Sequence, residues 1–150
     1  MAVFESHTPL MCSPQELFDF LILPKNLEEL SEDDQLVLIS APEKLSLGAS
    51  LVFEIRGFGL VKRVEHAITR FDPPRGFREE MVSGPLQHWQ HDYILEPLEP
   101  RGVTLINRIE FTPPSGFLGL ILNEKRLLDH LADVHAQRQQ ALRSRWGALP

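Results

Sequence analysis

Cysteine is almost missing from this sequence. Cys12 is the only one among 150 residues, which excludes an internal disulfide and any metal site built from a cluster of thiolates. This use of cysteine suits a reducing compartment. A basic run is missing too, and 15 basic residues against 21 acidic ones give a net charge of −6. Because nucleic-acid affinity comes mainly from neutralising phosphates, we expect no nucleic-acid partner.

Long apolar segments are also missing. Residues 1–13 carry acids and no basic region ahead of an apolar run, and the apolar run at 117–122 is far too short to cross a bilayer. We therefore expect no membrane span and a cytoplasmic location. The hydrophobic fraction of 43% and the charged fraction of 24% are typical of a globular protein. At this length we predict a single domain over residues 1–150.

Helix signals occur near both ends of the chain. Residues 13–16, Ser-Pro-Gln-Glu, form a capping box with proline at the first helical position. Asn26 is a candidate cap for a second short helix that ends at Leu30. A long helix is predicted over roughly 118–146, with Ser115 as its candidate cap. Its apolar positions recur at helical spacing, and they are Leu120, Ile121, Leu127, Leu128, Leu131, Val134 and Leu142.

The central part of the chain has the pattern of β-strands. Each connection is too short for a crossover helix, so we predict a meander of about five antiparallel strands after an opening strand. Pro9 indicates that the opening strand lies at an edge of the sheet or stops there. The predicted class is α+β, with a curved antiparallel sheet covered by the long helix. The expected strands are 4–10, 35–40, 51–56, 62–71, the two halves of 76–96, and 103–111.

One hairpin, residues 76–96, has an apolar face with polar side chains set into it. We interpret this face as the floor of an internal pocket, because such pockets combine apolar walls with a few polar groups. Read at the two-residue period of a strand, it carries Phe77, Glu79, Met81, Trp89, His91, Tyr93 and Leu95.

The loop centres predict how the strands pair. The expected pairs are Phe71 with Phe77, Thr69 with Glu79, Glu79 with His91, Met81 with Trp89, and His91 with Asn107. These pairs place the polar side chains of Glu65, Glu79, His91 and Asn107 on the inner face. The full set of candidate ligand-binding residues is Phe53, Glu65, Phe71, Phe77, Glu79, Met81, Trp89, His91, Tyr93, Asn107, Ile109, Phe111, Leu131 and Arg138. The other face is expected to be exposed to water, and it carries His66, Arg70, Arg78, Glu80, His88, Gln90, Asp92, Thr104, Arg108 and Glu110.

His91 is the best candidate for chemistry, because an imidazole near a carboxylate acts as an acid or base near neutral pH. Glu79 is its expected partner or acts itself, and burial would raise the pKa of this carboxyl group. Arg138 lies in the inward sector of the long helix, where it pairs with Glu79 or Glu65, anchors an anionic ligand, or stays solvated. The alternative to a pocket is a solid core in which Glu79, His91 and Asn107 satisfy one another.

Metal and nucleotide sites are not expected. His88 and His91 are three apart on a strand and point to opposite faces, while His130 and His135 diverge by about 140° around a helix. The segment 57–60, Gly-Phe-Gly-Leu, lacks the third glycine and the helix of a dinucleotide loop. We therefore predict no metal and no cofactor.

The order of these elements, with several local motifs, resembles the START-like helix-grip superfamily (SRPBCC), which includes polyketide cyclase/dehydrase-like, coenzyme Q-binding and pollen-allergen-type proteins. The local similarity is to an uncharacterised ligand-binding branch. The segments that carry it are 13–18 with 27–30, 68–77, 84–85 with 89–91, and 109–113, followed by the helix with Arg138.

The resemblance implies a small hydrophobic or amphipathic ligand, such as a lipid, a quinone or a polyketide-like molecule, between sheet and helix. The first alternative is a cyclase/dehydratase-type enzyme that uses His91 and Glu79 as its acid/base pair. The second is a non-catalytic interaction module with a collapsed pocket. A homodimer is left open.

Overall fold

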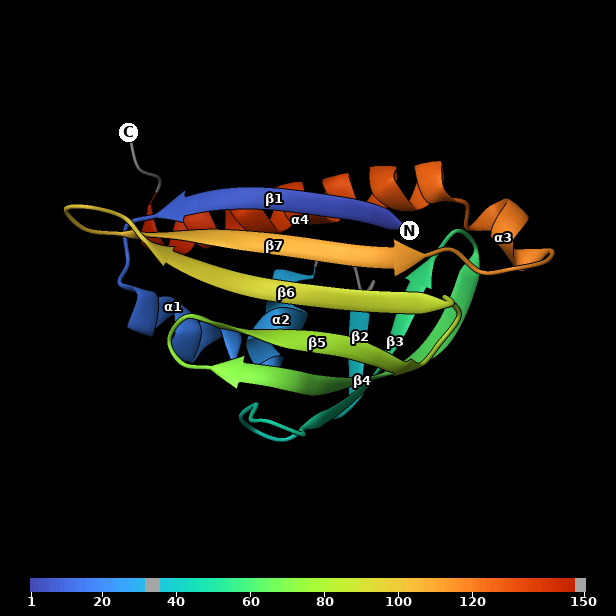
Figure 1. Ribbon diagram of the computed structural model, residues 1–150, viewed down its shortest axis with the longest axis horizontal. Helices are drawn as coiled ribbons and strands as arrows, with labels where there is room; N and C mark the ends of the chain where they lie inside the picture. Colours follow the sequence, from blue (N-terminus) through green and yellow to red (C-terminus); the bar gives the residue numbers. More distant parts are fainter. Residues whose placement is uncertain (32–35, 148–150) are drawn as a thin grey trace.

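The computed structural model describes residues 1–31 and 36–147, which fold as one curved antiparallel sheet with helices against it (Figure 1). The sheet has seven strands in the order β1-β7-β6-β5-β4-β3-β2. The strands are β1 (Ala2–Leu10), β2 (Leu36–Ser40), β3 (Ser50–Gly57), β4 (Leu60–Asp72), β5 (Gly76–Ser83), β6 (His88–Pro97) and β7 (Val103–Thr112). The helices are α1 (Pro14–Leu21), α2 (Pro24–Leu30), α3 (Leu118–Ile121) and α4 (Glu124–Trp146). The predicted α+β helix-grip architecture is therefore confirmed, and β1 lies at an edge as Pro9 indicates.

Helix α1 begins at the predicted capping box. The Ser13 hydroxyl accepts from the Glu16 amide at 3.1 Å, and the Glu16 carboxylate accepts from the Ser13 amide at 3.3 Å. The helix buries Leu17 and Phe18 against the sheet. Two of the unpaired amides at the start of the helix are satisfied in this way, which holds α1 at the correct point after β1.

Ser13→Ala is expected to lower the free energy of unfolding by about 1 kcal/mol, because it removes the side-chain acceptor of the cap. Urea denaturation measures this change. Ser144→Ala is the matched control, since this exposed hydroxyl only contacts a carbonyl within α4, and it should change stability by less than about 0.5 kcal/mol. Equal midpoints for the two variants would show that the cap does not stabilise α1.

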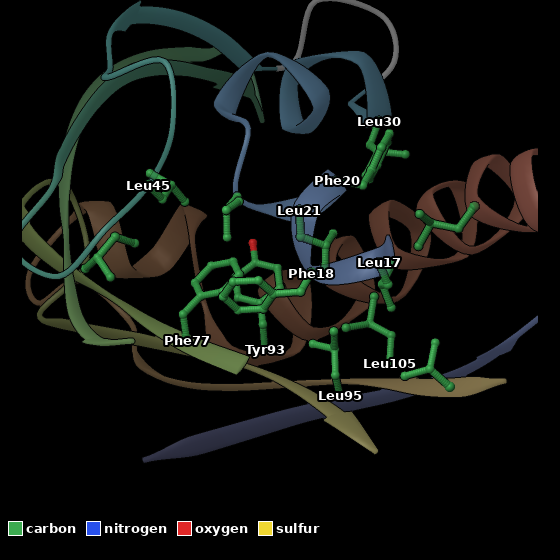
Figure 2. Packing of buried hydrophobic residues seen from close by; sticks show 14 of the residues in the cluster. Leu17, Phe18, Phe20, Leu21, Leu30, Leu45, Phe77, Tyr93, Leu95 and Leu105 are labelled. Atoms are coloured by element: carbon green, nitrogen blue, oxygen red, sulfur yellow. The ribbon is translucent and has the colours of Figure 1, made fainter. Parts of the chain in front are cut away.

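The main core lies between the helices and the concave face of the sheet (Figure 2). Phe18 of α1 contacts Phe71 edge to face at a centroid distance of 5.4 Å and Phe77 at 6.1 Å. Phe77 and Tyr93 stack at 4.4 Å and rise side by side from β5 and β6 toward the helices. Leu142 joins the same cluster from α4. Phe71 and Phe77 are thus part of the packing that holds α1 on the sheet.

Two expected helix starts are wrong. Asn26 does not cap α2, since it is buried inside the helix and donates to the Phe20 carbonyl at 2.8 Å. The predicted long helix is interrupted after α3, and α4 begins with Asn123, whose side chain accepts from the Arg126 amide at 2.9 Å. Asparagine competes for backbone amides and so favours a new helix start over a continuous helix.

The interruption changes which side chains face inward. Ser115 caps neither helix, because α3 starts from Phe117 without a side-chain bond. Leu120 was expected on the buried face of a long helix, but it is 73% exposed. The segment before Asn123 therefore follows a different direction from α4.

The predicted pairing of β4 with β5 is wrong on one side of a β-bulge in β4. Phe71 faces Phe77 as expected, but Ile68, not Thr69, is opposite Glu79, because the register shifts between Ile68 and Arg70. One extra residue in a strand reverses the alternation of its side chains beyond that point. His66 was expected to be exposed to water and is instead buried at 4% exposure.

Two of the other predicted pairs involve His91, one with β5 and one with β7. Glu79 lies opposite His91 as predicted. His91 lies opposite Ile109, and Asn107 lies opposite Tyr93, so this register is displaced by two residues. A displacement of two keeps every side chain on its face, and the Asn107 side chain still reaches His91.

Candidate functional site

A pocket of about 180 Å³ lies between α4 and the concave face of the sheet. Strands β2 to β7 and helices α2 and α4 contribute to its wall. Apolar side chains dominate the wall, and they include Leu27, Leu30, Phe53, Val64, Met81, Leu86, Trp89, Ile109, Leu127, Leu131 and Val134. A smaller group of polar side chains is set among them, namely Ser31, Lys62, His66, Glu79, His91, Tyr93, His130, His135, Gln137 and Arg138.

The structure brings many of the predicted residues to this pocket. The ones that line it are Phe53, Glu79, Met81, Trp89, His91, Tyr93, Ile109, Leu131 and Arg138. Phe71, Phe77 and Phe111 pack in the hydrophobic clusters instead. Asn107 is buried behind His91, and the Glu65 carboxylate lies away from the pocket and accepts from the Ser50 hydroxyl at 3.1 Å. Glu65 points outward for the same reason that His66 points inward, which is the bulge in β4.

The closest polar contact in the pocket joins His66 and Glu79. The distance from His66 Nδ1 to Glu79 Oε2 is 2.5 Å, and both side chains are almost fully buried. The sequence pattern indicated His91 as the partner of Glu79. His66 was not among the predicted site residues, since strict alternation along β4 gives no sign of the bulge.

Glu79 is ionised in this setting. Burial by itself would raise the pKa of the carboxyl group, but the hydrogen bond from His66 and the nearby charges outweigh this effect and lower the pKa. A carboxylate only accepts hydrogen bonds, so His66 Nδ1 carries a proton, and in the neutral imidazole the lone pair lies on Nε2. The pair therefore presents an imidazole whose tautomer is set by a buried carboxylate.

His91 has a different environment. Its ring stacks on Tyr93 at a centroid distance of 3.9 Å, and its Nε2 lies 2.8 Å from Asn107 Oδ1. Burial lowers the pKa of His91 to about 4. The His135 ring lies near His91, with 5.9 Å between the two ring centroids. Burial, together with Arg138, lowers the pKa of His135 to about 2. Both imidazoles are thus neutral near physiological pH.

Arg138 supplies positive charge to the pocket. One guanidinium nitrogen donates to the Ser31 hydroxyl at 3.3 Å. Its Nε is buried and has no hydrogen-bond partner among residues 1–31 and 36–147, and the same is true of Trp89 Nε1. Burial raises the pKa of Tyr93, whose hydroxyl lies near Arg138 and stays protonated. Arg138 and Trp89 both line the pocket.

Two further features bear on the site. Within the described ranges, no group of three or more histidine, cysteine or acidic side chains has the arrangement of a metal site. In the same part of the chain, no helix is both long and apolar enough to span a bilayer.

Comparisons with known proteins define the fold. No family model matches the chain, and no curated protein is similar to it in sequence. The protein TTHA0849 from Thermus thermophilus superposes with a TM-score of 0.73 at 10% identity, over 95% of this chain and 98% of that chain. The Zhui aromatase/cyclase from Streptomyces sp. R1128 has a TM-score of 0.71 at 10% identity, over 95% and 94%.

A plant protein has the same architecture. The major latex-like protein 151 from Panax ginseng has a TM-score of 0.65 at 11% identity, over 94% of this chain and 97% of that chain. These likenesses place the chain in the helix-grip class of α+β proteins. The chain therefore has the helix-grip fold that its sequence predicts.

Proposed function

We propose that the chain is one domain that binds a compact amphipathic molecule in the pocket between α4 and the sheet. The observation that carries this proposal is a mainly apolar wall that includes Arg138 and Trp89, whose buried donors Arg138 Nε and Trp89 Nε1 have no partner among the described residues. A buried donor without an acceptor costs about 1–3 kcal/mol. A ligand that supplies an acceptor would recover this free energy, which favours a carbonyl, carboxylate or phenolate group on the ligand.

The pocket volume favours a small ring system. A cavity of roughly 150 Å³ holds one benzene molecule, so about 180 Å³ suits one or two rings or a short acyl group. Among lipids, quinones and polyketide-like molecules, the size therefore favours a polyketide-like aromatic or the ring of a quinone. The tail of a longer lipid would have to extend beyond the pocket.

Native mass spectrometry of protein purified without detergent, before and after organic extraction, tests for a copurifying ligand. A thermal-shift panel then compares naphthoates and benzoates with uncharged analogues of equal size and with fatty acids of increasing length. We expect stabilisation by the carboxylates, which amounts to about 2.7 kcal/mol at a hundred times Kd. If no mass copurifies and no compound in the panel raises Tm, the proposal is wrong.

Val134→Trp is expected to weaken binding of the best compound at least tenfold, or about 1.4 kcal/mol, because a large ring at this position fills the pocket. Ala132→Trp is the matched control, since Ala132 lies on the exposed side of the same helix. Isothermal titration calorimetry of both variants gives the two values of Kd. Equal weakening by the two substitutions would place the binding site elsewhere.

A second candidate function is catalysis by proton transfer. The observation that favours it is the short contact between His66 and Glu79 in the pocket wall. The fold itself does not decide between binding and catalysis, because one fold hosts many functions.

A further inference from the structure

We propose that His66 and Glu79 form a general-base dyad in which His66 removes a proton from a carbon acid held in the pocket. His66 is the catalytic residue, because it lines the pocket. Glu79 is a positioning residue that acts through His66. This inference rests on the proposed function, since the pocket must first hold the substrate.

The geometry leaves one nitrogen of His66 for chemistry. Nδ1 is engaged by Glu79 at 2.5 Å, so in the neutral imidazole Nε2 carries the lone pair. Two aromatic rings contact the His66 ring. Phe53 packs edge to face at a centroid distance of 4.8 Å, and Trp89 stacks at a centroid distance of 6.3 Å. A base that is held in one tautomer and one orientation does not lose rate to reorientation before the proton transfer.

Glu79 also stabilises the product of the transfer. When Nε2 takes a proton, the imidazole becomes a cation, and the buried carboxylate beside Nδ1 compensates this charge. Among the described residues that line the pocket, Glu79 is the sole acid. The positive charge on His66 would therefore have no other acidic partner in this wall.

The opposite charge develops on the substrate. Arg138 and Tyr93 line the same pocket, the Tyr93 hydroxyl lies near Arg138, and the Arg138 charge lowers the pKa of Glu79. Donors of this kind stabilise an oxyanion. The substrate class that fits is a compact carbonyl compound with an acidic hydrogen on the carbon next to the carbonyl.

The reaction balances within the protein and this substrate. The C–H bond breaks, the proton goes to His66 Nε2, and the electron pair forms the C–C double bond of an enolate. The negative charge rests on the carbonyl oxygen beside Arg138 and Tyr93. Return of the proton to another atom of the substrate regenerates the dyad, so the step requires no oxidant or reductant.

His91 is a poorer candidate for the base than sequence reasoning suggested. Its Nε2 is occupied by Asn107 at 2.8 Å, and its ring stacks on Tyr93. A lowered pKa of about 4 also makes it a weak base. Glu79 is opposite His91 across the strands, yet its carboxylate bonds to His66.

The test uses 5-nitro-1,2-benzisoxazole, a two-ring carbon acid, as the probe. A base takes the C–H proton of the isoxazole ring, the electron pair forms the nitrile, the N–O bond breaks, and a cyano-nitrophenolate with a strong colour forms. We expect wild-type protein to accelerate this elimination over buffer. His66→Gln keeps an N–H donor for Glu79 and should lower kcat by about a hundredfold with little change in KM, which is the usual contribution of a general base.

Glu79→Gln should lower kcat and alter its pH profile, because an amide no longer holds the His66 tautomer or balances the imidazolium. His7→Gln is the matched control and should leave kcat unchanged. His7 bonds to Glu5 at 2.7 Å, but this pair lies on the exposed surface of β1. Circular dichroism confirms that each variant is folded before its rate is compared.

Binding of the unreactive analogue 5-nitrobenzotriazole is measured by calorimetry on the same samples. If the analogue binds and the probe is not accelerated, the dyad is overturned and the proposed binding function stands. If His91→Gln lowers kcat and His66→Gln does not, His91 is the base and the dyad is equally overturned. If neither compound binds, both the dyad and the proposed one- or two-ring ligand class are wrong.

Discussion

His66→Leu is expected to lower the free energy of unfolding by about 3–5 kcal/mol. The substitution leaves the Glu79 carboxylate buried without the hydrogen-bond donor that lies 2.5 Å away, and an uncompensated buried charge is strongly destabilising. Urea denaturation at neutral pH measures the change. The double variant His66→Leu/Glu79→Leu should recover most of the loss, because apolar replacements of a buried pair are often neutral or stabilising.

The exposed pair of His7 and Glu5 is the control for this experiment. Both side chains are largely accessible to solvent, so His7→Leu should cause no measurable loss of stability. If His66→Leu has as small an effect as His7→Leu, Glu79 is neutral in the fold or has moved to water. Either result would contradict the ionised carboxylate that we infer.

Acidification from pH 6.5 to about 4 is expected to remove about 3 kcal/mol of stability through His91. The pKa of this residue falls from 6.5 to about 4 on folding because it is buried. In this interval the unfolded chain binds a proton that the folded chain does not, so stability is complete above pH 6.5 and decreases as the pH falls. Each unit of pKa difference corresponds to about 1.4 kcal/mol.

Two neighbours act in the same direction. The lowered pKa of His135 extends the loss to lower pH. Glu79 has a lowered pKa as well, so its contribution is complete above pH 4.5 and is lost as the pH falls through its folded value. Urea denaturation at a series of pH values measures the slope. His135→Phe should make the slope shallower, and a slope identical to wild type would show that His135 is not buried in its neutral form.

The helices and most of the fold could be predicted from local signals. The capping box at Ser13, the alternation of the 76–96 hairpin and the loops too short for crossover helices each report a nearby constraint. The prediction was weaker wherever one polar side chain changed the local path. Asn123 begins a new helix where the apolar spacing suggested a continuous one.

The candidate site was predictable on one strand pair and not on the next. Glu79 and His91 were placed on the same face because the hairpin turn between them sets their register. His66 was missed because the bulge at Thr69 depends on how β4 pairs with β5 in the folded sheet. No residue type near Thr69 marks the bulge, and a single inserted residue is enough to exchange Glu65 for His66 on the inner face.

The sequence by itself determined the α+β class, the order of the elements and the strand face that carries Glu79, His91 and Tyr93. These features follow from periodicity, capping and turn chemistry, which act over a few residues. Only the tertiary structure decided which imidazole bonds to Glu79 and which nitrogen of that imidazole is left for chemistry. It also decided which buried donors lack an acceptor among the described residues. Those outcomes depend on contacts between β4, β5, β6 and α4, where a shift of one residue changes the partner while the local pattern stays the same.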